Sequence, residues 1–568
     1  MKTLIKIIMI CFLTSENYAQ ELNVISVSPL PQSLSALPQD PIVITFDQPL
    51  DVSSFNENSF RVFGRWSGPM TGNFNISGDG IIGTFIPDRP FFYGEVINVR
   101  LTKDIIGTST DPLTNGFGYN YWIKTKPALL NLLFNSQIEM RLPGENLIQC
   151  YGAYAGDIND DEYSDLVVVN ENSEDIRVLF NDGSGNYSAF ILFDMPNANR
   201  PSTNEGSDFD HNGKIDIAIG NTQSNNVSVF MGNNSTVFEN EINYIADNGV
   251  RGITVIDING DGWDDIATAN RIASNISILV NDGTGNFNAP INIETGTSQE
   301  TAIVATDLNN DGYTDLIVGA YNSNEIVTLL NDGTGNFTVF DTVSINGSPW
   351  MITIGDLNGD GNVDVATANS SSASVSILFG DGNGNLNLSD EYSVSDFPLA
   401  IDVGDIDGDG DLDFIVSSFT GANFMLWENN GSGIFNNPIT YPSVKAGSCA
   451  IFHDRNNDGA LDLTLIDELA DLVILYNNTP ILATEEVVTQ PPLTVYPNPF
   501  KEKLFLSRNI NSPITFKLYD LLGRLILTKI INETNSINFT NSHLIEGLYI
   551  AELSYDKIIT RVKVYKKN

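Results

Sequence analysis

The sequence of 568 residues predicts an all-β protein in which a seven-bladed β-propeller lies between a β-sandwich and a smaller C-terminal β-sandwich. An acidic loop recurs seven times at a spacing of 49 to 51 residues, and four short β-rich runs accompany each copy. A fixed period of this size is typical of repeat architectures, because one repeat cannot bury its apolar face alone. Four strands per repeat are typical of propeller blades.

Residues 1–19 are the first element. Lys2 and Lys6 precede the apolar run 7–13, and Ala19 stands before Gln20. This pattern predicts a secretory signal peptide cleaved after Ala19. Lipid attachment at Cys11 is a weaker alternative, because bulky Ile10 precedes it. No other run is apolar and long enough to span a bilayer, so we expect no transmembrane segment in the mature chain.

Residues 20–127 predict a β-sandwich. The expected short strands are Val24–Pro29, Ile42–Phe46, Asp47–Asp51, Gly83–Pro87 and Val96–Leu101. A strand ending in Phe46 and followed by Pro49-Leu-Asp51 resembles bacterial Ig-like domains of surface-layer type. The resemblance implies a spacer or an accessory binding domain, and we favour the spacer.

The loop 405–413 shows the chemistry of the repeat. Asp405, Asp407, Asp409 and Asp413 occupy its positions one, three, five and nine. Two carboxylates ~4 Å apart repel by roughly 4 kcal/mol at an effective dielectric constant near 20, so the converging acids predict a cation. Alternating Asp or Asn oxygens, a glycine at position six and a carbonyl at position seven form the Ca²⁺ pattern of EF-hand-type loops, although strands flank this loop.

The same four positions carry Asp or Asn in every copy. The other predicted ligands are Asp157, Asn159, Asp161, Asp165; Asp208, Asp210, Asn212, Asp216; Asp257, Asn259, Asp261, Asp265; Asp307, Asn309, Asp311, Asp315; Asp356, Asn358, Asp360, Asp364; and Asp454, Asn456, Asp458, Asp462. We expect up to seven structural Ca²⁺ ions. Glu162 replaces the glycine in the first loop and Asn212 the position-five carboxylate in the second, so calcium binding by these two loops stays open.

The propeller is expected over 128–480. In the fifth copy, strands are predicted at 351–355, 365–368, 374–379 and near Leu386. The seventh copy ends after its third strand, 472–476, whereas 133–142 reads as a fourth strand without a blade. We therefore expect 133–142 to complete blade seven and close the ring.

These repeats resemble the FG-GAP/VCBS family, the calcium-loop propeller blades also found in integrin α-subunit heads. The resemblance covers roughly 128–480 and implies a calcium-stabilised propeller with a ligand-binding face.

Charge limits the choice of partner. The formal net charge is −43, and no Lys or Arg occurs between Arg271 and Lys445. A basic stripe that could neutralise phosphates is therefore missing from the repeats, which argues against nucleic acid or an anionic membrane. Cys150 and Cys449 fall on the innermost strands of neighbouring blades, where two buried thiols are favoured over a disulfide.

The end of the chain changes composition. Residues 481–492 read as a linker, and 493–568 form a basic segment expected to fold as a small β-sandwich. Pro497-Asn-Pro499, the run 516–524 and the run 544–550 resemble, in this order, the type A C-terminal sorting domain of type IX secretion. The resemblance implies export by that machinery, removal of the domain, and a secreted or cell-surface location.

Ligand-contacting residues are predicted from a position that varies among the repeats. Six residues before each loop stand Tyr151, Ser202, Arg251, Thr301, Trp350, Leu399 and Ser448. Aromatic and Arg side chains anchor interfaces, so Tyr151, Arg251 and Trp350 are the candidate contacts, with packing of the blade ends as the plainer alternative. The three histidines form no recognisable catalytic or zinc pattern.

We therefore predict a monomeric, secreted calcium-binding protein that binds an extracellular glycan or protein without catalysis, as an adhesin does. The alternatives are a carbohydrate-active hydrolase or lyase on the same scaffold, and an inert structural surface protein.

Overall fold

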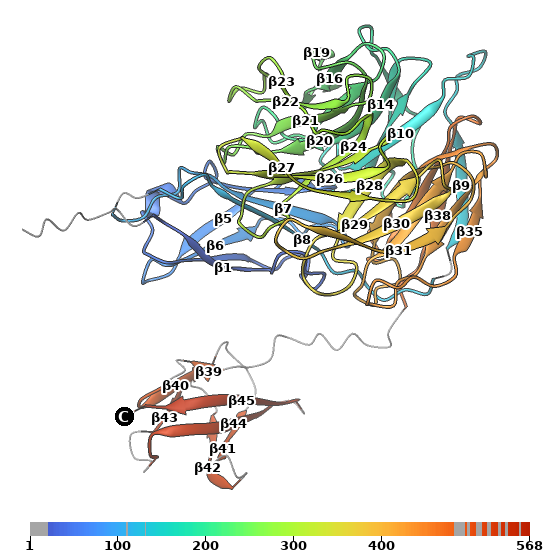
Figure 1. Ribbon diagram of the computed structural model, residues 1–568. Coiled ribbons are helices and arrows are strands. Elements are labelled where there is room, and N and C mark those ends of the chain that lie inside the picture. The colour runs from blue at the N-terminus through green and yellow to red at the C-terminus, as the bar shows by residue number, and fades with distance from the viewer. Residues whose placement is uncertain are drawn as a thin grey trace, which may run out of the picture. The chain divides into compact units, whose positions relative to one another are not determined.

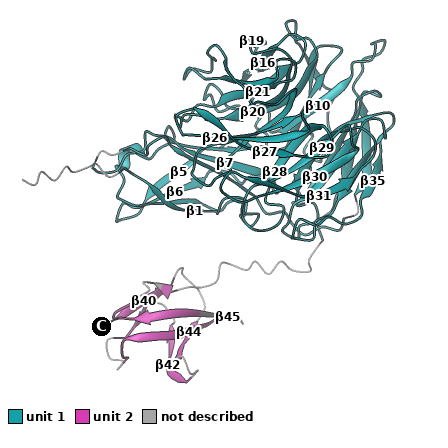
Figure 2. Ribbon diagram, viewed as in Figure 1, with its two compact units in different colours: residues 1–481 teal, residues 482–568 magenta. Residues whose placement is uncertain are grey.

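The computed structural model describes residues 21–109, 112–130, 132–481, 495–496, 500–506, 514–519, 524–531, 536–539, 544–555 and 558–567. The predicted signal peptide, most of the predicted linker and the Pro497-Asn-Pro499 motif lie outside these residues. The chain divides into two compact units, 1–481 and 482–568, which we describe separately (Figure 2). The described residues form strands and one short 3-10 helix, Val52–Ser54. None of the described helices has the length and apolarity needed to cross a membrane.

The N-terminal part of the first unit is a pair of four-stranded sheets. One has the order β1 (Val24–Ser28), β2 (Ile42–Phe46), β6 (Ile82–Pro87), β5 (Gly72–Ile76). The other has the order β4 (Gly68–Pro69), β3 (Phe60–Gly64), β7 (Val96–Leu101), β8 (Phe117–Trp122). Alternate residues of β2, β3 and β7 are buried in one apolar core that both sheets share, as the period of two in their sequences requires.

One strand expected in this sandwich does not form. In 47–51 only Leu50 pairs, through an isolated bridge to Gly107. Pro49 has no N–H to donate, and the Asp51 side chain instead accepts a hydrogen bond from the Ser53 N–H at the start of the 3-10 helix. The prediction of a strand over Asp47–Asp51 was therefore wrong.

Seven four-stranded antiparallel sheets follow, and they are the blades of the propeller (Figure 1). The strands of blades one to three are β10 (Cys150–Gly156), β11 (Asp165–Asn170), β12 (Asp175–Leu179), β13 (Ile191–Asp194); β14 (Pro201–Ser207), β15 (Asp216–Asn221), β16 (Asn226–Phe230), β19 (Ile242–Ile245); and β20 (Val250–Ile256), β21 (Asp265–Asn270), β22 (Asn275–Leu279), β23 (Ile291–Ile293). Blade two also carries a small hairpin of β17 (Gly232–Asn233) and β18 (Val237–Phe238).

Blades four to seven repeat the pattern. Their strands are β24 (Glu300–Thr306), β25 (Asp315–Ala320), β26 (Glu325–Asn331), β27 (Phe337–Ser344); β28 (Pro349–Gly355), β29 (Asp364–Asn369), β30 (Ser374–Gly380), β31 (Leu386–Ser393); β32 (Pro398–Gly404), β33 (Asp413–Ser418), β34 (Asn423–Trp427), β35 (Ile439–Pro442); and β36 (Gly447–His453), β37 (Asp462–Asp467), β38 (Leu472–Asn477), β9 (Leu133–Glu139). The second strand of each blade is buried along its whole length, because the neighbouring blades cover both of its faces.

The ring closes as the sequence predicted. Each innermost strand contacts the innermost strand of the next blade, and β10 of blade one contacts β36 of blade seven. Strand β9 pairs with β38, with Glu139 opposite Leu472 and Leu133 opposite Asn477. A strand that precedes the first repeat thus completes the last blade.

The second unit contains two further sheets. Their orders are β39 (Val495–Tyr496), β40 (Lys503–Leu506), β43 (Ser536–Asn538) and β42 (Leu525–Ile531), β41 (Ile514–Tyr519), β44 (Gly547–Tyr555), β45 (Ile558–Lys566). Phe500, Leu504, Phe516 and Leu553 belong to one buried core that joins both sheets, so this segment is a small β-sandwich.

Candidate cation loops and ligand site

Backbone hydrogen bonds hold the acidic loops in shape. In loop seven, the two carboxylate oxygens of Asp454 accept hydrogen bonds from the N–H groups of Asp458 at 3.1 Å and Gly459 at 2.9 Å. At position nine, Asp462 accepts from the N–H of Asn478 at 2.8 Å. Equivalent bonds recur at position nine of the other loops and at position one of all but loop six, for example from Gly380 to Asp364 and from Gly361 to Asp356. The carboxylates are therefore turned inward by the chain itself.

Several inward oxygens have no hydrogen-bond donor among the described residues. These buried atoms are Asn259 Oδ1 at position three of loop three, Asp405 Oδ1 at position one of loop six and Asp462 Oδ2 at position nine of loop seven. The carboxylates of Asp208, Asp210 and Asp216, and those of Asp405, Asp407 and Asp413, each bring three oxygens within 4.8 Å of one another. Burial and neighbouring carboxylates raise the pKa of Asp413 well above its ordinary value. These loops have the oxygen ligands and the excess negative charge that fit a hard divalent cation.

The β-sandwich covers the loop end of the propeller. Its backbone N–H groups donate to loop carbonyls, from Lys103 to Gly260 at 2.9 Å and from Gly118 to Gly312 at 2.7 Å. The Thr125 hydroxyl donates to Asp405 Oδ2 at 2.8 Å. Because these contacts reach several loops, this end of the propeller is an interface within the chain.

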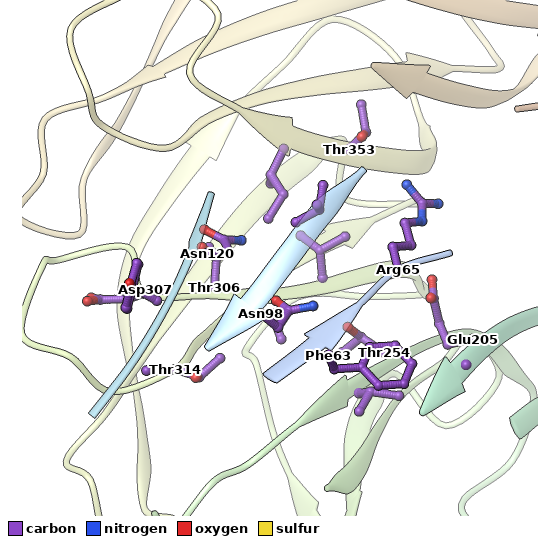
Figure 3. Close-up of a pocket in the computed structure, with 18 of the residues that line it drawn as sticks. Phe63, Arg65, Asn98, Asn120, Glu205, Thr254, Thr306, Asp307, Thr314 and Thr353 are labelled. Atoms are coloured by element: carbon purple, nitrogen blue, oxygen red, sulfur yellow. The ribbon is translucent and has the colours of Figure 1, made fainter. Parts of the chain in front are cut away.

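A polar chamber of about 230 Å³ lies between the sandwich and the inner strands of the propeller (Figure 3). Arg65, from the sandwich, extends into it, and its Nη1 lies 3.5 Å from Asp402 Oδ1 of blade six. Glu205 of blade two lines the same chamber (Figure 3). Burial raises the pKa of both carboxyl groups, and the positive charge of Arg65 opposes that shift.

The opposite end of the central channel is closed by the three predicted ligand contacts. The Trp350 indole N–H donates to the Tyr151 hydroxyl at 2.8 Å, and a guanidinium N–H of Arg251 donates to the same oxygen. The Arg251 Cζ lies 4.3 Å from the centre of the Tyr151 ring and 4.7 Å from that of Trp350. A second cavity of about 120 Å³ lies between this cluster and Arg65. The structure brings the three residues together, and their contact with a ligand stays a prediction.

A second varied ring surrounds this cluster, and the sequence analysis missed it. It consists of the residue fourteen positions after the first residue of each loop: Glu171, Thr222, Arg271, Tyr321, Ser370, Phe419 and Glu468. In every blade its backbone N–H donates to a carbonyl just before the innermost strand, as from Arg271 to Gly249 at 2.8 Å and from Tyr321 to Gln299 at 2.9 Å. The residue at this position changes from blade to blade although its backbone position stays the same. Comparing the repeats in the sequence could therefore have identified this ring.

Arg271 and Tyr321 of this ring pack on the outer side of Trp350. The Arg271 Cζ lies 4.7 Å from the centre of the Tyr321 ring and 5.0 Å from that of Trp350. The rings of Tyr321 and Phe397 lie 5.5 Å and 5.9 Å from that of Trp350. All four side chains are partly exposed, whereas Tyr151 and Arg251 are each only 6 % exposed. An external ligand at this end would therefore meet Trp350, Arg271, Tyr321 and Phe397 first.

An acidic pair borders the cluster on the side of blades one and seven. The Gln149 side-chain amide donates to Glu171 Oε2 at 2.9 Å and to Glu468 Oε1 at 2.6 Å. Glu171 also accepts from Arg251 at 3.3 Å and from Arg200 at 3.0 Å. Burial and the charge of Glu171 raise the pKa of Glu468 to about 7.

The described histidines and cysteines that the sequence analysis considered pack against or bond to neighbouring side chains, or are free thiols. His211 of loop two stacks on Trp263 with ring centres 3.7 Å apart, and buried His453 contacts Ser164 and Thr464. Cys150 and Cys449 are free thiols, as favoured from the sequence, but only Cys150 is buried, whereas Cys449 is half-buried.

These observations define a β-propeller built from acidic-loop repeats. Six overlapping segments match the model of the FG-GAP-like repeat, over residues 157–219, 208–268, 257–318, 307–367, 356–416 and 405–465. The chain belongs to the FG-GAP-like repeat family, as the resemblance in the sequence predicted.

Residues 494–567 match the secretion system C-terminal sorting domain. This domain indicates export by type IX secretion to the cell surface or the extracellular space, in agreement with the sequence motifs. No curated protein sequence matches the chain.

Solved structures similar to this chain include three with low sequence identity. An Agrocybe aegerita lectin, described as recognising non-reducing terminal N-acetylglucosamine, is 18% identical with a TM-score of 0.38, and the match covers 71% of this chain and 94% of the lectin. A putative 6-phosphogluconolactonase from Bacteroides uniformis is 12% identical with a TM-score of 0.43, covering 69% and 99%. An auxiliary nutrient binding protein from Bacteroides ovatus is 12% identical with a TM-score of 0.36, covering 81% and 98%. These similarities carry no functional argument.

Proposed function

We propose that the protein binds an extracellular glycan or protein ligand without catalysis, on the surface formed by Trp350, Arg271, Tyr321 and Phe397. The observation that carries this proposal is the contrast between the two ends of the propeller. One end repeats the same loop and is covered by the sandwich. At the other end, equivalent positions differ from blade to blade and gather aromatic rings and guanidinium groups.

The charge of this surface indicates which chemical group the ligand carries. Arg271 makes no ion pair or side-chain hydrogen bond with the described residues, although the chain has a formal net charge of −43. A half-buried guanidinium without an acidic partner favours a ligand that carries a carboxylate or a similar anion. Flat aromatic neighbours supply rigid apolar contact beside it.

We further propose that Ca²⁺ ions occupy the acidic loops as structural ions. The residues that would hold them are the Asp and Asn side chains at loop positions one, three, five and nine. Support comes from the buried oxygens without donors in loops three, six and seven and from the clustered carboxylates of loops two and six. The ions would stabilise the blades and lie at the end remote from Trp350.

Binding to an array of polysaccharides and matrix glycoproteins tests this function. The mature chain should be retained on particular spots, and Arg271→Gln and Trp350→Ala should each weaken that retention at least tenfold. Lys214→Gln is the matched control, because it removes a positive charge beside Asp160 at the loop end. Retention that is unchanged in both site variants would remove this surface from consideration.

The acidic pair keeps a hydrolase or lyase as the second candidate. Glu468 is 3 % exposed, its Oε2 has no donor among the described residues, and its pKa is raised to about 7, so it can hold a proton near neutral pH. Glu171 is the neighbouring acid. Release of reducing ends or unsaturated products from a polysaccharide, abolished by Glu468→Gln, would favour this candidate over the binding protein.

A further inference from the structure

The first acidic loop differs from the other six in the residue at position six, which is Glu162 in place of glycine. Glu162 occupies position six with a φ of 67°, in the left-handed region where loops two and seven have Gly213 and Gly459. The four predicted ligand side chains of loop one are nevertheless of the same types as those of loop seven. Residue types at the ligand positions therefore do not distinguish loop one from loop seven.

A side chain of the sandwich reaches into this loop. Arg89 Nη1 lies 3.0 Å from Asp157 Oδ2, the position-one carboxylate, and its other terminal N–H group donates to the Ser67 carbonyl. The Asp157 N–H donates to the Trp66 carbonyl at 2.7 Å, which fixes the loop against the same segment of the sandwich. The Asp157 side chain is completely buried. The Arg89 guanidinium is thus fixed by one hydrogen bond to the loop and one to the sandwich.

In the described part of the chain, no other loop has an arginine at ion-pair distance from a ligand-position carboxylate. The charges of Arg61, Arg100 and Arg455 act only from further away, where they partly offset the burial that raises the pKa of Asp208, Asp257 and Asp462. The remaining ion pairs involve Asp402, Asp264, Asp471, Glu145, Asp175, Glu171, Asp160 and Glu552, none of which occupies a ligand position. In loops three, six and seven a ligand-position oxygen is buried without a donor, whereas no such oxygen is found at the four ligand positions of loop one.

Arginine keeps its charge at every accessible pH. A Ca²⁺ ion bound to Asp157 Oδ2 would lie about 4 Å from the guanidinium, since calcium–oxygen bonds measure roughly 2.4 Å. Charges of +2 and +1 at that distance repel by roughly 8 kcal/mol at an effective dielectric constant near 20, which strongly disfavours calcium at Asp157 Oδ2 while the guanidinium stays.

We propose that loop one takes no calcium ion, because the guanidinium of Arg89 occupies its place and joins blade one to the sandwich by a metal-independent ion pair. This inference rests on the proposed calcium occupancy of the other loops. It limits the chain to at most six ions.

Calcium stoichiometry of the mature chain, measured by equilibrium dialysis, tests the proposal. Asp157→Asn should bind as many ions as the unaltered protein, whereas Asp454→Asn, the matched change in loop seven, should bind one fewer. Loss of one ion in Asp157→Asn would overturn the proposal. If neither the unaltered protein nor its variants bind calcium, the proposed role of calcium fails and this inference with it.

Two further variants keep the test informative if Asp157→Asn does not fold. Asp161 is exposed at position five and does not contact Arg89, so Asp161→Asn should leave the count unchanged while Asp458→Asn lowers it by one. Arg89→Gln should add one ion, because Asp157, Asn159, Asp161 and Asp165 then face the loop without a competing charge. An unchanged count in Arg89→Gln would contradict the claim that the guanidinium excludes the ion.

Discussion

The indole N–H of Trp350 donates a hydrogen bond to the hydroxyl of Tyr151 at 2.8 Å, although the two residues are 199 positions apart. Trp350 belongs to blade five and Tyr151 to blade one, so this bond crosses the channel at the centre of the ring. Arg251 of blade three lies over both rings. Side chains from three blades thus close the end of the channel that the sandwich leaves free.

Removing the shared acceptor should destabilise the protein. In Tyr151→Phe, the buried N–H group of Arg251 and the part-buried indole N–H of Trp350 that point at the hydroxyl lose their partner. An unsatisfied buried donor costs about 1–3 kcal/mol, so the free energy of unfolding in urea should fall by that amount. Tyr313→Phe in loop four is the control and should change it by less than about 0.5 kcal/mol. Equal effects of the two substitutions would mean that the central hydrogen bonds contribute nothing specific.

The Arg65–Asp402 contact should matter more than a surface ion pair. Arg65→Met would leave buried Asp402 and half-buried Glu205 without a cation. The Arg65 side chain is 39% exposed and the contact measures 3.5 Å, so we expect a loss between the ~1 kcal/mol of a surface pair and the ~3 kcal/mol of a weak buried pair. The free energy of unfolding should drop accordingly, and the double variant Arg65→Met/Asp402→Asn should recover part of the loss. No recovery in the double variant would show that Arg65 acts through packing alone.

Calcium removal should lower thermal stability. If each calcium-binding loop has a Kd of about 0.1 mM, 1 mM free calcium stabilises the fold by about 1.4 kcal/mol per site. The melting temperature should therefore fall on addition of EDTA and recover with excess Ca²⁺. Asp405→Asn combined with Asp413→Asn should reduce the calcium-dependent gain, whereas Asp79→Asn, in an exposed turn of the sandwich, should not. A melting temperature independent of EDTA would contradict a structural role for the ion.

The buried carboxyl group of Glu95 should make stability depend on pH. Burial raises its pKa from 4.5 to about 7, although it accepts hydrogen bonds from the N–H groups of Trp66, Ser67 and Phe92. Between these two pH values the folded state binds more protons than the unfolded state, so this contribution to stability is full below pH 4.5 and is lost as pH rises through 7.

The difference in unfolding free energy between the unaltered protein and Glu95→Gln isolates this effect, because both share the acidic loops. From pH 4.5 to pH 8 the difference should move against the unaltered protein by about 3 kcal/mol. A constant difference would show that Glu95 has an ordinary pKa in the folded protein.

The sorting domain should be required for export. A chain ending before residue 493 should accumulate inside the outer membrane of a type IX-secreting bacterium, and the full chain should reach the surface or the medium. Fractionation and immunoblotting distinguish the two. Surface delivery of the truncated chain would show that 493–568 is dispensable.

The parts that sequence predicted well are those that repeat. The loop positions, the four strands per blade and the closing strand follow from a local pattern seen seven times. In the sandwich, β5 was missed because Gly72, Asn73 and Asn75 are poor strand formers, and its formation depends on pairing with β6. Comparing one varied position across blades singled out Tyr151, Arg251 and Trp350, which the structure brings into contact with one another, while their role in ligand binding stays a prediction.

Contacts between segments that are distant in the sequence could not be predicted from local sequence patterns. Arg271 and Tyr321 stand at an equivalent position that follows a different strand, and comparison across blades would have reached them. The Arg89–Asp157 pair depends on how the sandwich docks on the propeller, and no periodic feature of either segment encodes that arrangement. The domain favoured from sequence as a spacer contacts the loops directly, through Thr125 and Lys103 among others.

The pairing of β9 with β38 has a kinetic consequence. Glu139 and Leu472 are about 330 residues apart in the sequence. The entropic free-energy cost of closing a loop of that size is roughly 3–4 kcal/mol higher than that of closing a short hairpin. The first six blades can form from neighbouring segments, but the seventh needs β9, which is made hundreds of residues before its partner β38. During synthesis and passage across the inner membrane, β9 must therefore remain an unpaired edge until the last repeat arrives. We expect chaperones that shield exposed strands to act on this protein mainly in that interval.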